Sequence, residues 1–125
     1  MKYSVDKNDN YSVLQLEEDN LNSLIAPNLK SEFVFLRNEG VKNLIFDLTA
    51  VKYVDSSGLS AILTANRLWK DFGKFILTGV EHPAVKKLIE ISRLESILTI
   101  IPTVAESVEF LNMESIEEEL QSDSE

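Results

Sequence analysis

The segment Asp55-Ser56-Ser57-Gly58 carries the residues of this chain best suited to chemistry. It follows an apolar stretch and opens a helix-forming one, so a serine hydroxyl is expected at a helix amino terminus. The helix macrodipole stabilises added negative charge there. Two interpretations stay open from these residues. Asp and Ser are favoured N-cap residues, and a hydroxyl beyond the carboxyl ends of the strands is placed for function. Gly58 would leave room for the backbone or phosphate of a partner.

Other kinds of chemistry have few candidate residues. The chain has no cysteine and one histidine, His82, which stands beside Pro83 at a predicted helix start and is interpreted as structural. The four glycines are too far apart for a phosphate-binding loop, and no Ser/His/Asp triad is recognisable. We therefore predict no catalytic residue, no metal site and no cofactor.

The predicted helix after Gly58 has an apolar face and a polar stripe. Steps of 100° per residue place one set of residues on the core face: Ala61, Ile62, Ala65, Leu68, Trp69 and Phe72. Leu59 and Leu63 fall on the polar side of this wheel, between Lys70 and Arg67 in projection, and are expected beside Ser57. Either they form the edge of the core, or they are apolar anchors for a protein partner.

Strand and helix periodicities alternate along the chain. Apolar runs predict strands, and residues spaced three and four apart predict helices, with Gly40, Gly73 and Pro102 at boundaries. The predicted strands span 3–5, 11–16, 44–48, 74–78 and 97–101; the predicted helices span 25–39, 57–72, 82–92 and 104–112. This order predicts an α/β fold with a mostly parallel central sheet, an antiparallel N-terminal hairpin and about four helices.

Length and charge restrict the class of protein. A chain of 125 residues with 44% hydrophobic residues suits one domain with a core. Its net charge of −9 disfavours direct binding to nucleic acid or anionic membrane. Neither a signal peptide nor a membrane span is evident, and cysteine is absent, so we expect a soluble cytoplasmic protein.

The negative charge is concentrated at the end of the chain. Of the 21 acidic residues six follow Met113, where Lys and Arg are absent, which leaves 15 acidic against 12 basic residues and a net charge of −3 for residues 1–112. We interpret 1–112 as the folded domain and 113–125 as an acidic tail, disordered or a frayed helix. The tail serves either solubility or partner binding.

Three segments in order resemble STAS domains of the anti-sigma factor antagonist type. The first is the motif Asp55–Leu59. Asn20-Leu21-Asn22 followed by Ala26-Pro27-Asn28-Leu29 is similar to the stretch before the family's first helix. His82-Pro83-Ala84-Val85-Lys86-Lys87-Leu88, with Ile91-Ser92 and Leu94, resembles the third helix.

The resemblance implies a phosphorylation switch rather than an enzyme. Such antagonists bind an anti-sigma factor that is also a serine kinase, and so free the sigma factor. Phosphorylation of the second serine of the motif abolishes binding, and a metal-dependent PP2C-type phosphatase restores it. The resemblance makes Ser57 the phosphoacceptor. The residues expected around the docked partner are Asn22, Asp55, Ser56, Gly58, Leu59, Ser60 and Leu63. The alternative is a scaffold, or a subunit of a larger signalling or transport complex, without phosphorylation.

Asn22 is a departure from the family pattern. The family often has an aspartate at this position, on a loop expected near Ser57. Asparagine keeps the shape and an acceptor oxygen but loses the charge. The departure concerns the presentation of Ser57 to a kinase rather than the fold.

Overall fold

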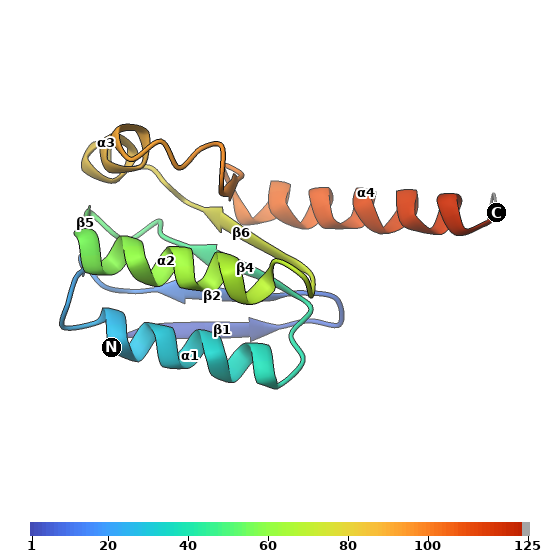
Figure 1. Ribbon diagram of the computed structural model, residues 1–125, viewed down its shortest axis with the longest axis horizontal. Helices are drawn as coiled ribbons and strands as arrows, with labels where there is room; N and C mark the ends of the chain where they lie inside the picture. Colours follow the sequence, from blue (N-terminus) through green and yellow to red (C-terminus); the bar gives the residue numbers. More distant parts are fainter. Residues whose placement is uncertain (124–125) are drawn as a thin grey trace.

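A five-stranded sheet forms the centre of the molecule, in the strand order β1-β2-β4-β6-β7 (Figure 1). The structure is a computed structural model that describes residues 1–123. The strands are β1 (Tyr3–Lys7), β2 (Ser12–Leu16), β4 (Asn43–Asp47), β6 (Lys74–Thr78) and β7 (Thr99–Ile100). β1 pairs with β2 antiparallel and the other strands pair parallel, which confirms the predicted sheet.

Four helices cover the sheet, as the sequence predicted. They are α1 (Ala26–Asn38), α2 (Ser56–Trp69), α3 (Pro83–Ile91) and α4 (Val104–Asp123). Prolines near the starts of α1 and α3 have a backbone angle suited to the first helical turn. Apolar residues of α1, α2 and α3 share one core cluster, whereas those of α4 belong to a second, smaller one. The sheet therefore has α1, α2 and α3 on one face and α4 on the other.

Alternation along the central strands explains the two clusters. Leu44 and Phe46 of β4 face the cluster of α1 to α3, and Ile45 between them faces α4. In the larger cluster Phe33 packs edge-on against the rings of Phe46 and Trp69, at centroid distances of 5.2 and 6.4 Å. An aromatic centre thus holds α1 and α2 against the sheet.

A second, two-stranded parallel sheet was not predicted from the sequence. β3 (Asn20–Leu21) pairs with β5 (Tyr53–Val54). Two residues are too few for an alternating pattern to identify a strand. The pairing joins the loop before α1 to the segment that leads into the serine motif.

α4 is longer than the predicted helix 104–112. It continues to Asp123, through most of the segment in which we expected a disordered tail or a frayed helix; residues 124–125 lie outside the described part. Figure 1 shows its far end extending away from the sheet. Lys74 at the start of β6 forms an ion pair with Glu114 at 3.3 Å. No helix within residues 1–123 is long and apolar enough to cross a bilayer.

Phe72 does not lie on the core face where the helical wheel placed it. α2 ends at Trp69, so Phe72 no longer follows the helical spacing. Its ring is partly exposed, and the guanidinium of Arg37 lies 3.5 Å from the ring centroid, a favourable cation–π contact.

Replacing Phe33 should test the aromatic centre. We expect Phe33→Ala to lower the free energy of unfolding by about 3–5 kcal/mol, because it removes a fully buried ring and leaves a cavity. Phe35→Ala is the matched control: this ring on the same helix is 54% exposed, and its loss should cost about 0.5 kcal/mol. Urea denaturation followed by circular dichroism measures both, and equal losses would contradict the packing described.

Candidate functional site

Asp55 is the N-cap of α2. Its Oδ1 accepts a hydrogen bond from the backbone N–H of Gly58 at 2.9 Å, and its carbonyl oxygen accepts one from the N–H of Leu59 at 2.9 Å. The helix therefore begins at Ser56, and Ser57 is its second residue. The capping interpretation is confirmed, and the cap presents the two serines on the first turn.

Gly58 is buried where α2 meets β3. A Cβ atom at this position would collide with the carbonyl oxygen of Leu21 and lie 2.7 Å from its Cγ and 2.9 Å from Cγ1 of Val54. The space beside Gly58 is filled by Leu21, instead of being open to a partner as the sequence suggested. The glycine allows close packing of the helix on the small sheet.

Ser57 lies half-buried at the edge of an open hollow of about 410 Å³. The rest of the lining comes from the loop before α1, the start of α1 and the first turns of α2: Ser23, Ala26, Pro27, Lys30, Ser56 and Ser60. Three of the predicted residues, Ser56, Ser57 and Ser60, are thus brought together. Because the hollow is open to solvent, it has room for an added group on Ser57.

Lys30 was not among the residues predicted for this site. Its ammonium donates a hydrogen bond to Oγ of Ser60 at 3.2 Å. The lysine is on α1, and its position in the sequence gives no sign that it lies beside the serine motif.

Asn22 organises the loop before α1 rather than lining this hollow. Its Oδ1 accepts a hydrogen bond from the N–H of Leu24 at 3.0 Å, and its carbonyl oxygen accepts from the N–H groups of Ile25 and Ala26. A carboxylate oxygen accepts the same bonds. The asparagine therefore keeps the turn that an aspartate would form, without adding a charge.

Leu59 and Leu63 are partly buried and packed against the larger core cluster, which favours their interpretation as the edge of the core. Other apolar side chains of this region are more exposed. Leu24, in the loop before α1, is 84% exposed, and Tyr53 of β5 is 61% exposed. They are better placed than the two leucines to be anchors for a protein partner.

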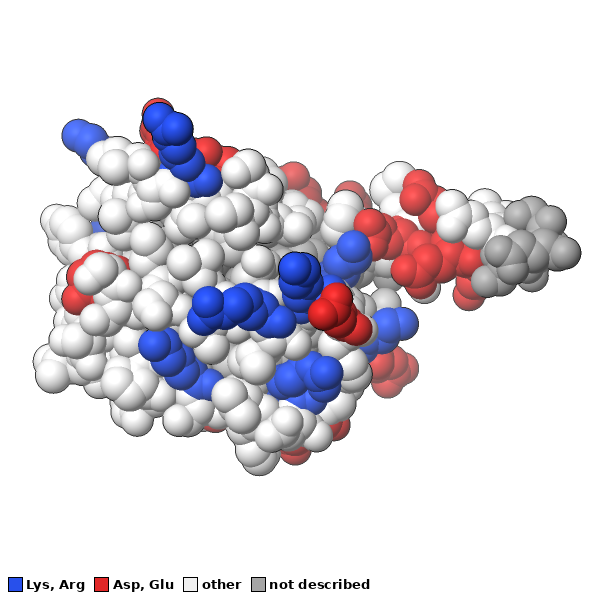
Figure 2. All heavy atoms as spheres, in the orientation of Figure 1, with Lys and Arg blue, Asp and Glu red and all other residues white. Residues whose placement is uncertain are grey.

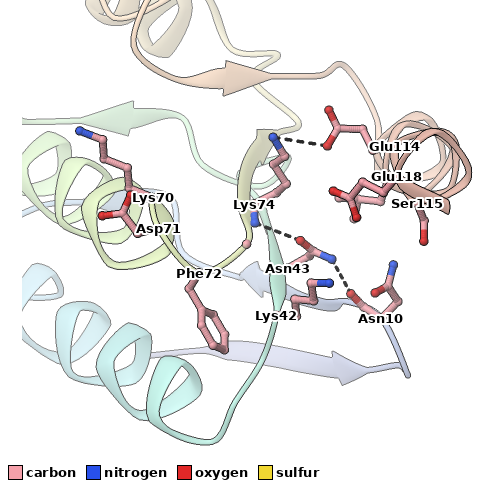
Figure 3. A pocket seen from close by; sticks show the side chains of 12 residues that line it. Asn10, Lys42, Asn43, Lys70, Asp71, Phe72, Lys74, Glu114, Ser115 and Glu118 are labelled. Carbon is pink, nitrogen blue, oxygen red and sulfur yellow. Dashed lines mark hydrogen bonds and ion pairs between the residues drawn. The ribbon is translucent and has the colours of Figure 1, made fainter. Parts of the chain in front are cut away.

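A second hollow lies at the opposite end of the sheet, near the starts of β4 and β6 (Figure 3). Its charged lining contains Lys42, Lys70 and Lys74 together with the acidic residues Asp71, Glu114 and Glu118. Asn43 links its walls: its amide donates to the carbonyl of Asn10 at 2.8 Å, and its Oδ1 accepts from the N–H of Lys74 at 2.9 Å.

Basic and acidic side chains are distributed unevenly between the body of the protein and α4. Figure 2 shows Lys and Arg side chains gathered on one face, over α1 and α2, and acidic side chains along the projecting helix. Because the second hollow already places lysines opposite the carboxylates of α4, its charges are compensated within the molecule. The hollow beside Ser57, which has one cation among the described residues of its lining, is the better candidate for a functional site.

Comparison with known proteins gives a family and several similar structures. The STAS domain model matches residues 2–107. An anti-sigma factor antagonist from Mycobacterium paratuberculosis has 20% identity and a TM-score of 0.80, with 89% of this chain and 93% of that chain covered. A putative anti-sigma factor antagonist from Thermotoga maritima has 23% identity and a TM-score of 0.76, covering 88% and 94%. The Bacillus cell fate determinant SpoIIAA in its phosphorylated form has 18% identity and a TM-score of 0.67, covering 88% and 99%. At these identities the likeness establishes the fold.

Gly58→Ala should test the close contact beneath the site. Alanine is favoured over glycine inside a helix by about 1 kcal/mol, yet we expect the free energy of unfolding to fall by about 1–3 kcal/mol, because the added methyl group collides with Leu21. Ser57→Ala, next to it on the helix, is the control and should change the stability by about 0.5 kcal/mol at most. A gain in stability for Gly58→Ala in urea denaturation would contradict the contact.

Proposed function

Because the chain belongs to the STAS domain family, we propose that it is an anti-sigma factor antagonist controlled by phosphorylation of Ser57. In its unphosphorylated form it binds an anti-sigma factor with serine kinase activity, so that the sigma factor is released in the cytoplasm. The kinase transfers a phosphoryl group from ATP to Oγ of Ser57, and binding is lost. A PP2C-type phosphatase removes the phosphate and restores binding.

The position of Ser57 carries this proposal. The side chain is half-buried on the first turn of α2 and borders a hollow that is open to solvent. A kinase can reach such a hydroxyl without unfolding the domain. The similar structures include proteins described as anti-sigma factor antagonists and one in a phosphorylated form, which supports the same role here.

The charge of a phosphate explains how the modification could act as a switch. Phosphorylation adds about −1.5 to −2 charges at neutral pH. The amino end of α2 tolerates this charge in the free protein. In a docked complex the same charge would be desolvated, at a cost of several kcal/mol unless it is paired. The modification can therefore abolish binding while the fold remains intact.

The candidate residues fall into two groups: those that would contact the partner and those that hold the first turns of α2 in place. Asp55 and Ser56 are exposed beside Ser57, so we place them, with Ser60 and the loop at Asn22, in the surface that meets the partner. Gly58, Leu59 and Leu63 pack inward and act by holding the first turns of α2 in place. In this proposal the chain is a binding protein, without catalytic residues of its own.

A kinase assay tests the site of modification. An anti-sigma factor kinase from the same organism, supplied with ATP, should add one phosphate to the wild-type protein and to Ser56→Ala, but none to Ser57→Ala. Intact-protein mass spectrometry measures the gain in mass. The assignment fails if an active kinase adds no phosphate to the wild type, or if the added phosphate persists in Ser57→Ala.

A binding assay tests the switch. Ser57→Ala should bind the anti-sigma factor about as well as the wild type does, whereas Ser57→Asp should lose at least about a hundredfold in affinity, equivalent to about 3 kcal/mol. Ser115→Asp is the matched control, since this exposed serine lies by the second hollow at the other end of the sheet. Titration calorimetry gives the dissociation constants. Undiminished binding by Ser57→Asp would favour the alternative of a scaffold that works without phosphorylation.

A further inference from the structure

α1 and α2 lie side by side and run in the same direction (Figure 1). Near their starts, Lys30 of α1 donates a hydrogen bond to Ser60 of α2. Near their ends, Nε of Arg37 donates to the carbonyl oxygen of Leu68 at 3.0 Å. Both helices therefore begin at the hollow beside Ser57, and the positive ends of two helix dipoles are directed toward it.

Lys30 is the one charged residue among the described residues that line this hollow. Its side chain is attached one turn into α1 and is partly buried. Its hydrogen-bond partner, the hydroxyl of Ser60, is neutral, and no carboxylate among the described side chains of residues 1–121 forms an ion pair with it. The ammonium charge thus stands uncompensated beside the predicted phosphoacceptor.

Ser57 and Ser60 are one helical turn apart, so their side chains lie close together on the same side of α2. An ammonium held by Ser60 can reach a phosphate on Ser57 by rotation about its long, flexible side chain. Such a movement exchanges a hydrogen bond to a neutral hydroxyl for a charge-assisted bond to a phosphate, which is the stronger of the two.

We propose that Lys30 is the counter-ion of phosphoserine 57: the ammonium leaves Ser60 and binds the phosphate in the hollow between the starts of α1 and α2. The proposal rests on the proposed function, because it names the residue that regulates the same site. Part of the new negative charge is then neutralised inside the free protein. Lys30 thus stabilises the phosphorylated form and has little effect on the unphosphorylated one.

The test uses full-length protein with phosphoserine incorporated at position 57 during translation, so that no kinase is required. Phosphorus NMR follows the titration of the phosphate in the wild type, Lys30→Gln and Lys30→Arg. We expect the titration midpoint of the wild type to lie about half a pH unit below that of Lys30→Gln, since a nearby cation favours the doubly charged phosphate. Lys30→Arg should keep the low midpoint because it keeps the positive charge.

Lys87→Gln is the control, because this exposed lysine belongs to α3 and not to the hollow; its midpoint should equal that of the wild type. Circular dichroism establishes that each variant is folded. Equal midpoints for the wild type and Lys30→Gln would overturn the counter-ion proposal. Failure of the proposed function would be seen elsewhere, as absent phosphorylation by the kinase, and would leave the NMR result unchanged.

Discussion

The first turn of α2 packs directly on the backbone of Leu21, and the candidate site depends on this contact. The carbonyl oxygen of Leu21 accepts a hydrogen bond from the N–H of Asp55 at 3.2 Å and also lies against Gly58. Since Gly58 faces inward, the serines that precede it on the helix are directed to the sides and outward. One contact thus unites the loop before α1, the small sheet and the serine motif into a single structural unit.

The two ends of the central sheet differ in their electrostatics. At the carboxyl ends of the strands, the described lining of the hollow beside Ser57 consists of four serines, one lysine, one alanine and one proline. At the amino ends, lysines face the carboxylates of α4. The charges at the amino ends of the strands compensate one another. A phosphate would therefore change the local electrostatic potential most at the carboxyl ends, beside Ser57. The acidic α4 keeps most of the net charge of the protein away from the candidate site.

The elements that sequence analysis predicted correctly have strong local patterns. The apolar runs of β4 and β6 are bounded by polar residues or glycine, and α1 and α3 have proline near their starts. Two short strands were not predicted, and the helix predicted over 104–112 was too short. β3 and β5 have two residues each, and α4 continues through a segment whose composition is typical of a solvated tail. Phe72 was assigned to the core because the end of α2 was placed three residues too late.

The sequence by itself determined the order of the helices and of the strands of the central sheet, the cap of α2 and the presence of a serine at its start. These features rest on hydrogen bonds and periodicities within a few residues of one another, as in the bond between Asp55 and Gly58. The tertiary structure alone decided what surrounds that serine. Leu21 beneath Gly58 and Lys30 beside Ser60 come from segments about thirty residues or more away along the chain. Their positions follow from the packing of α1, α2 and the two sheets, for which no local pattern in the chain is a guide.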